Sequence, residues 1–95
     1  MTIDIDKEKW VFIIIQNPGV DEQIVGLHDK EAELDFIPAF MEKETAEECF
    51  INMERERGVK YEVQAIIFEE LESYASENNF RIFFLNAQGK VLKKM

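Results

Sequence analysis

Hydrophobic and polar positions follow two different periods along this chain, which predicts a mixture of strands and helices. The clearest signal is the uninterrupted apolar run Trp10–Ile15, which combines aromatic with β-branched residues. Such a run is typical of a strand whose two faces are both covered. Pro18 and Gly19 follow it, and this pair favours a turn with a positive φ at the glycine. We therefore expect a central strand that ends in a turn.

Three more segments in the first two thirds of the chain have the composition of strands. Residues 23–28 form a short one, and the acidic stretch 29–35 after it is expected to be a solvated loop. Residues 36–40 form another, where Pro38 predicts an edge position or a missing donor that faces outward. Residues 60–68 begin with alternating polar and apolar positions and end continuously apolar, as a strand entering a covered sheet does.

Two segments change to helical spacing. Thr45 and Glu48 match the capping box, and Gly58 supplies a left-handed stop, so a first helix is expected from residue 45 to about residue 57. A second helix is expected over residues 69–78, with acidic residues at its start. The apolar face of the first helix is expected to consist of Ala46, Cys49, Phe50 and Met53.

The chain ends in a segment that predicts a β-hairpin. Residues 80–85 and 90–94 flank a turn in which Gly89 takes the left-handed position. The whole pattern indicates one α+β domain over residues 1–95, with residues 1–9 as a flexible N-terminal segment. We expect two layers: a mixed sheet of four or five strands with both helices packed on one face. The uncovered face would then invite dimerisation or a partner.

The net charge and the single cysteine limit which binding partners and which cellular compartment we expect. Twenty acidic residues against 11 lysines and arginines give a net charge of −9, which repels phosphate backbones and anionic lipids. We therefore expect no nucleic-acid and no membrane partner. The lysines at 90, 93 and 94 are interpreted as protection of an edge strand. Cys49 cannot form an intramolecular disulfide, and the start of the chain has no apolar signal core, so a cytoplasmic location is expected.

Few residues could carry chemistry. Cys49 and His28 are the only thiol and imidazole, and Cys49 is expected to be a core residue of a helix. With one of each, a zinc site of ordinary composition cannot be built. The alternate carboxylates of 29–35 resemble the start of a calcium loop, but Leu34 and Phe40 occupy the positions of the required glycine and glutamate. No catalytic residue, cofactor site or metal site is assigned.

A short stretch resembles a known family. The strand 36–40, the linker Met41–Glu44 and the helix start at Thr45-Ala46 resemble the N-terminal region of the enhanced serine sensitivity protein family. The same layout is similar to small bacterial domains of unknown function. The family often has Thr-Ser where this chain has Met41-Glu42. The resemblance implies an α+β fold and brings no catalytic residue with it.

The favoured interpretation is a non-catalytic protein-interaction or regulatory module that binds a protein partner or associates with itself as a homodimer. Two alternatives remain open. One is a small-molecule binder or enzyme with a site under the loop 17–35, for which His28 and Asp35 are the ligand candidates. The other is a subunit of a larger assembly. Without a recognisable catalytic motif, we lean against an enzyme.

Overall fold

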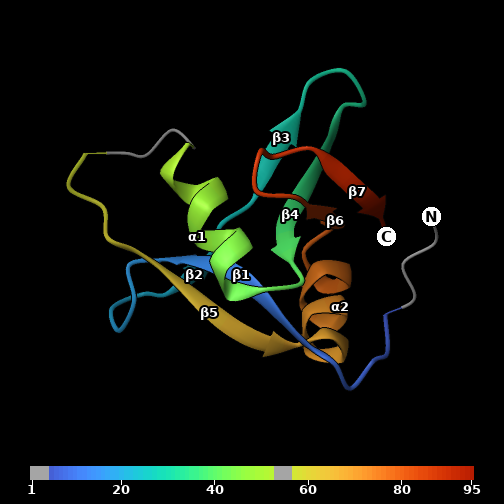
Figure 1. The fold of residues 1–95 in the computed structure, drawn as a ribbon, viewed down its shortest axis with the longest axis horizontal. Helices are drawn as coiled ribbons and strands as arrows, with labels where there is room; N and C mark the ends of the chain where they lie inside the picture. The colour runs from blue at the N-terminus through green and yellow to red at the C-terminus, as the bar shows by residue number, and fades with distance from the viewer. Residues whose placement is uncertain (1–4, 53–56) are drawn as a thin grey trace.

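The protein has an α+β fold, built from a seven-stranded mixed sheet and two helices in a computed structural model that describes residues 5–52 and 57–95 (Figure 1). The sheet has more strands than expected, because the segment 23–28 splits in two and both strands of the terminal hairpin join it. The elements in chain order are β1 (Trp10–Gln16), β2 (Gln23–Ile24), β3 (Leu27–Asp29), β4 (Leu34–Phe40), α1 (Lys43–Ile51), β5 (Tyr61–Ile67), α2 (Phe68–Glu77), β6 (Arg81–Leu85) and β7 (Val91–Lys94).

Strand β1 is the centre of the sheet. It pairs antiparallel with β5 over its whole length, from Trp10 opposite Ile67 to Gln16 opposite Tyr61. Its other edge is shared: the start of β1 pairs with β4, and its end pairs with β2. Strand β4 then pairs with β6 in parallel, and β7 closes that side as the second strand of the C-terminal hairpin. The main order across the sheet is therefore β5, β1, β4, β6, β7.

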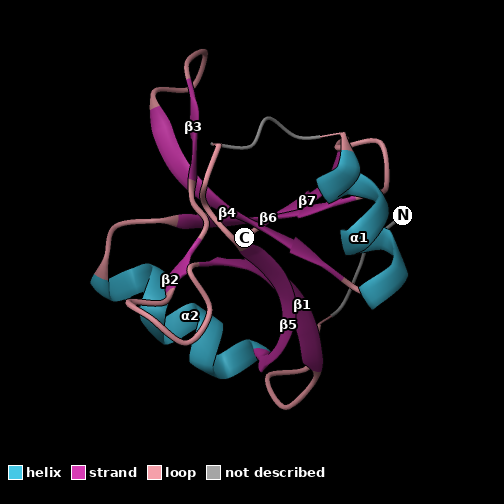
Figure 2. Cartoon of the chain, turned by 90° about the vertical axis from the view of Figure 1, so that its left-hand side faces the viewer, coloured by secondary structure: helices cyan, strands magenta, loops and turns pink. Residues whose placement is uncertain are grey.

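The two helices lie on opposite faces of the sheet, and the expectation that both cover one face is wrong (Figure 2). Strands β4, β5 and β6 all point the same way, since β4 and β5 both oppose β1 and β6 is parallel to β4. Helix α1 connects β4 to β5 in one direction across the sheet, and α2 connects β5 to β6 in the other. Crossovers of one hand that run in opposite directions place their helices on opposite faces.

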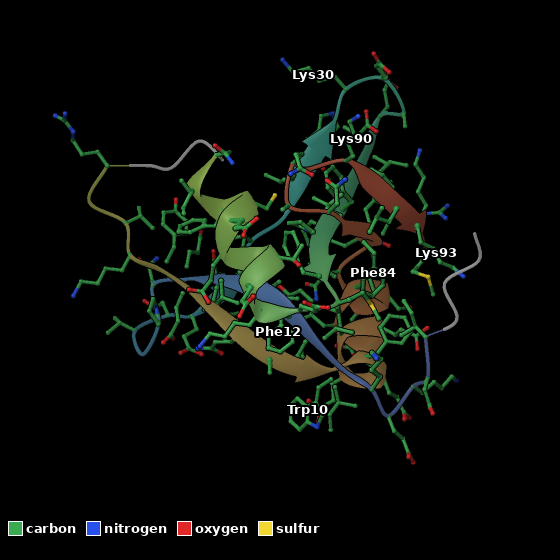
Figure 3. All side chains as sticks on the ribbon, in the orientation of Figure 1. Trp10, Phe12, Lys30, Phe84, Lys90 and Lys93 are labelled. Carbon is green, nitrogen blue, oxygen red and sulfur yellow. The ribbon has the colours of Figure 1, made fainter. Side chains whose placement is uncertain are left out.

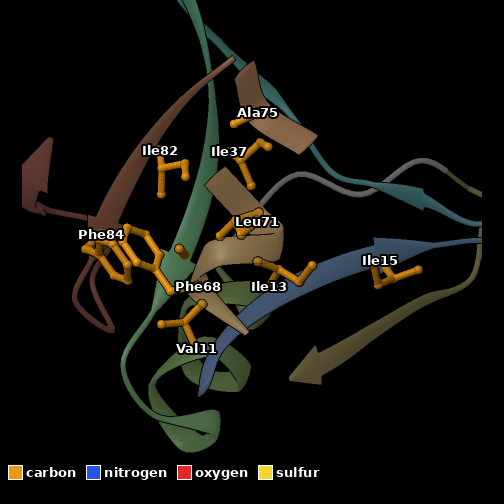
Figure 4. Packing of buried hydrophobic residues seen from close by; sticks show 10 residues of the cluster. Val11, Ile13, Ile15, Ile37, Phe68, Leu71, Ala75, Ile82 and Phe84 are labelled. Atoms are coloured by element: carbon orange, nitrogen blue, oxygen red, sulfur yellow. The ribbon is translucent and has the colours of Figure 1, made fainter. Parts of the chain in front are cut away.

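Two apolar layers follow from this arrangement. The odd positions of β1, from Val11 to Ile15, pack under α2, as Figure 4 shows, while Ile14 packs under α1. The chain's many phenylalanines are divided between the layers: Phe68 and Phe84 lie in the first and Phe40 and Phe83 in the second. No polar or charged side chain is buried in the described part of the chain. The predicted uncovered face therefore does not exist.

Pro38 lies in the interior strand β4, fully buried, and not at an edge as expected. The β1–β4 register, in which Ile13 faces Ala39, would next pair Ile14 with Pro38. Proline has no N–H to donate. The carbonyl oxygen of Ile14 instead accepts the N–H of Val25, at 2.9 Å. At Pro38, β4 therefore leaves β1, and the bent segment of β2 and β3 enters the gap, pairing first with β1 and then with β4.

Helix α1 begins earlier and ends earlier than the sequence pattern predicts. The capping box is wrong: Glu42 occupies the N-cap position without a side-chain cap bond, and Thr45 lies inside the helix. The helix stops at Asn52, whose side-chain amide donates to the carbonyl oxygen of Glu48 at 3.2 Å. Gly58 has a positive φ of 85° but lies beyond this end. Met53, predicted on the apolar face, lies outside the described residues.

The terminal elements agree well with the sequence. Helix α2 starts at Phe68 and ends at Glu77, one residue early at each end, with Asn78 as its C-cap. The hairpin of β6 and β7 is confirmed, with Gly89 at a φ of 82°. The side-chain oxygen of Asn86 accepts the N–H groups of Gln88 and Lys90 and so fixes the turn. Within the N-terminal segment, the carbonyl oxygens of Lys7 and Lys9 accept N–H groups from the start of α2.

Because both faces of the sheet are covered, truncating a core residue on either one should be costly. We expect Leu71→Ala, under α2, to lower the free energy of unfolding by about 2 to 5 kcal/mol, and Phe40→Ala, under α1, by about 3 to 5 kcal/mol. Val20→Ala, at an exposed position, should change it by less than about 0.5 kcal/mol. Urea denaturation measures all three. A small loss for Phe40→Ala alone would contradict a covered second face.

Candidate functional site

The two ligand candidates from the sequence, His28 and Asp35, lie opposite each other on the hairpin of β3 and β4. The Nδ1 atom of His28 and the Oδ1 atom of Asp35 are 2.9 Å apart. Their side chains are 55% and 56% exposed, so water surrounds the pair on most sides. The structure brings the candidates together as a cross-strand contact on the surface, and neither lines the hollows described below.

Cys49 lies in the core under α1, as the helical spacing predicts. The thiol is 3% exposed and packs in the same apolar cluster as Phe40 and Phe83. The turn at Gly89 approaches its Sγ atom from the C-terminal hairpin. Burial raises the pKa of the Cys49 thiol, which disfavours the thiolate needed for nucleophilic attack. The environment of this residue is therefore that of a structural cysteine.

The acidic stretch between β3 and β4 forms a turn. The Oδ1 atom of Asp29 accepts the backbone N–H of Glu31 at 3.0 Å and that of Ala32 at 3.3 Å. Such bonds within the loop are the usual way in which an aspartate stabilises a turn. Over residues 5–52 and 57–95, no three His, Cys, Asp or Glu side chains are grouped to hold a metal ion.

A small hollow lies beside the loop that the sequence suggested as a binding region. Its volume is about 240 Å³, and Glu22 and Ile24 of that loop contribute to its wall. The remaining wall is mostly apolar and comes from β1, β5 and α2, with Gln64 and Tyr74 as polar members. This hollow is the place in the structure that corresponds best to the small-molecule alternative, although His28 and Asp35 are not part of it.

The outer edge of β5 is the feature that the sequence analysis missed. The backbone bonds that frame the β1–β5 ladder join Asn17 N–H to the Lys60 carbonyl, and Phe68 N–H to the Lys9 carbonyl. In an antiparallel ladder such bonds recur at every second residue. The even-numbered residues of β5 therefore face β1, and the backbone groups of Val63, Ala65 and Ile67 point away from it. Within the described residues, β5 has β1 as its only strand neighbour.

This edge has few of the features that protect sheet edges from pairing. Strand β5 is seven residues long, contains no proline, and has Glu62 as its single charged residue. Natural edge strands are usually shortened, charged or interrupted by proline. Figure 1 shows β5 on the outside of the sheet, with the C-terminal hairpin at the opposite end. The sequence contained the composition of this strand, but not its place in the sheet order.

A groove with both apolar and charged walls adjoins the β5 edge on the face of α1, and Lys43, Glu47 and Glu62 are its charged members. The groove has a volume of about 450 Å³ and runs between the helix and the strand, with Phe50, Ile51 and Val63 among its lining residues. Ile51 is 67% exposed there. Trp10, which is 57% exposed, lies beyond the far end of the groove, and Phe12 lies between it and α1 (Figure 3). Edge and groove together form one continuous surface, the β5 edge surface.

The opposite end of the sheet has a different character. Strand β7 is four residues long and carries Lys93 and Lys94. The Nζ atom of Lys94 lies 5.2 Å from the centre of the Phe83 ring. Phe83 and Phe84 themselves are buried. Lysines on a short edge strand fit the predicted protection against edge pairing.

The buried position of Cys49 leads to a test of its reactivity. We expect native protein at neutral pH to react with iodoacetamide at least about tenfold more slowly than urea-unfolded protein, since burial blocks access and disfavours the thiolate. Mass spectrometry of the alkylated fraction over time measures both rates, with glutathione in the same buffer as a control. Equal rates in the two states would contradict a structural role for this thiol.

No helix in the described residues is long and apolar enough to cross a membrane. Comparison of the chain with protein-family models, curated proteins and solved structures finds no match. The resemblance to the enhanced serine sensitivity protein family therefore stays a prediction, and the candidate site rests on this chain's own residues.

Proposed function

We propose that this protein is a non-catalytic protein-interaction module that binds an extended chain segment along the outer edge of β5. The observation that carries the proposal is the outward direction of the N–H and C=O groups of Val63, Ala65 and Ile67 in a long, uncharged part of an edge strand. Strand addition to an open sheet edge is a common mode of peptide recognition. The partner surface thus moves from the expected sheet face to a sheet edge.

Backbone pairing would supply much of the affinity at this edge. Each outward residue offers one donor and one acceptor at the spacing of an incoming strand. These groups are solvated in the isolated protein, and their exchange of water for peptide partners gives a modest net gain per bond. Affinity therefore increases with the number of residues paired, and seven residues offer a longer match than β7 does.

The groove beside α1 would supply selectivity. Side chains of the odd-numbered β5 residues project onto the α1 face, where Val63 joins Phe50 and Ile51 in lining the groove. An incoming strand would place every second side chain on the same face. Apolar side chains at those positions would cover the exposed surface of Ile51. The module would thus prefer strands that alternate apolar with polar residues.

The proposal also includes a cytoplasmic location and a regulatory role for this acidic protein. A net charge of −9 supports binding of partners that carry basic flanking residues. The use of a single cysteine, with a core that needs no disulfide, supports a reducing compartment.

A strand-forming peptide tests the proposal without knowledge of the natural partner. The probe alternates threonine and valine between two terminal lysines and carries a fluorescent label. We expect Ala65→Pro to weaken its binding at least about tenfold, because proline removes an outward donor and leaves a peptide carbonyl without a bond. Fluorescence anisotropy measures the dissociation constants. The N–H of Ala65 faces away from β1, so the substitution breaks no bond of the native sheet.

Ala65→Val is the matched control, since it keeps the N–H and suits a strand. It should bind the probe as well as the unsubstituted protein does. A second probe with prolines in place of the threonines should not bind. No saturable binding by the unsubstituted protein at a dilution where it is a single chain, or equal binding by Ala65→Pro and Ala65→Val, would overturn the proposal.

A further inference from the structure

We propose that the strand added to β5 is the β5 strand of a second copy of this chain, so that two molecules form a continuous sheet across a two-fold axis at Gln64. This inference rests on the proposed function and names its partner. Its first support is the register. A two-fold axis at Gln64 matches the seven residues of β5 with the seven of the second copy, whereas an axis at Val63 or Ala65 pairs only five.

The backbone directions agree with this register. In an antiparallel pair centred on Gln64, Val63 faces Ala65 of the second copy, and Tyr61 faces its Ile67. All four are positions whose N–H and C=O groups point away from β1. The pair of Val63 and Ala65 can exchange both of its bonds. Gln64 itself falls in a pair without backbone bonds, where side chains approach each other most closely.

The side chains do not oppose this pairing. Glu62 is the one charged residue of the strand, and in this register it lies opposite Ile66 of the second copy, not opposite another carboxylate. Like charges directly across a ladder would be destabilising. At the axis, two Gln64 amides meet, and an amide group can both donate and accept. The two grooves beside α1 lie at opposite ends of the joined strands.

The charges that flank β5 favour a second copy in an antiparallel arrangement. Lys60 precedes the strand, and Glu69 and Glu70 follow it. The register places Lys60 opposite Phe68 of the second copy, beside that copy's two glutamates. These glutamates line an open hollow of about 550 Å³ together with Glu8. Each copy thus offers a cation to an acidic hollow of the other, which is the complementarity that an antiparallel two-fold pair requires.

Light scattering and sedimentation velocity over a range of concentrations test self-association. We expect the unsubstituted protein and Ala65→Val to have twice the mass of one chain, and Ala65→Pro to have the mass of one chain. Lys60→Glu should raise the dimer dissociation constant at least about tenfold, because it places a third carboxylate beside Glu69 and Glu70. Lys90→Glu is its control, with the same change of charge at the far hairpin (Figure 3), and should leave the dimer intact.

Disulfide cross-linking tests the register. In a Cys49→Ala background, Gln64→Cys should form a covalent dimer on mild oxidation, because its Cα atom and that of its counterpart would be about 4.5 Å apart. Glu62→Cys should not, because its counterpart would be four residues away along the ladder, at about 13 Å. Non-reducing gel electrophoresis separates the products. Cross-linking of Glu62→Cys without Gln64→Cys would overturn the two-fold axis at Gln64.

The outcomes separate this inference from the proposed function. A monomer at every concentration, with the threonine and valine peptide still bound and still lost in Ala65→Pro, would overturn self-pairing and leave the β5 edge as a site for another protein. A dimer that persists in both Ala65→Pro and Lys60→Glu would show that a different surface associates, and would overturn the inference as well. A monomer that also fails to bind the peptide would overturn both proposals.

Discussion

The double use of β1, paired along both edges and buried on both faces, is the constraint on which the rest of this structure depends. Residues Ile13, Ile14 and Ile15 are all buried, which requires an apolar layer above the strand and another below it. The opposite directions of the two crossovers supply these layers with one helix each. The aromatic residues that would exceed the capacity of one layer are divided between two, and the sheet edge is left as the surface with unpaired backbone.

The routing of the chain around β1 depends on one proline and one glycine. Pro38 cannot complete the ladder between β4 and β1, so the two strands diverge there and the segment of β2 and β3 fills the gap. Gly26 lies at the bend between β2 and β3, where a Cβ atom would come within 2.5 Å of the ring of Phe80. A wider residue would push this ring away from Tyr74, on which it stacks. The bend between β2 and β3 thus needs a residue without a side chain at position 26.

The sequence predicts the elements of this fold better than their arrangement. The apolar run of β1, the period change into α2 and the turn at Gly89 are local signals, and each identifies its element. The faces of the helices depend on the order of strands, which no local pattern contains. Pro38 shows the same limit. Its residue type indicates that one backbone hydrogen bond is missing, but not which neighbouring strand has the carbonyl group left without a donor. Thr45 satisfied a capping rule, yet α1 begins at Lys43, with Glu42 as its N-cap and no side-chain cap bond.

The candidate site illustrates this limit more sharply. Residue type alone makes His28 and Asp35 candidates, and the register of β3 and β4 brings them into contact at 2.9 Å on an exposed surface. Val63, Ala65 and Ile67 are unremarkable as residue types. Their backbone groups point outward. This direction follows from the β1–β5 pairing, in which the even-numbered residues of β5 bond to β1 and the odd-numbered residues face away from it. A search of the sequence for chemically distinctive side chains cannot find a site made of main chain.

The lysine-bearing strand β7 has a consequence for how far association can proceed. Fibrils grow because each unit has an open strand edge on both sides, so every addition creates a new place for the next one. In this sheet, β5 is long and sparsely charged, whereas β7 is four residues long, carries Lys93 and Lys94, and follows a register shift at Phe84 and Leu85. Two copies joined through β5 would present β7 at both outer ends. Such an assembly is closed, and amyloid-like propagation stops after the first step.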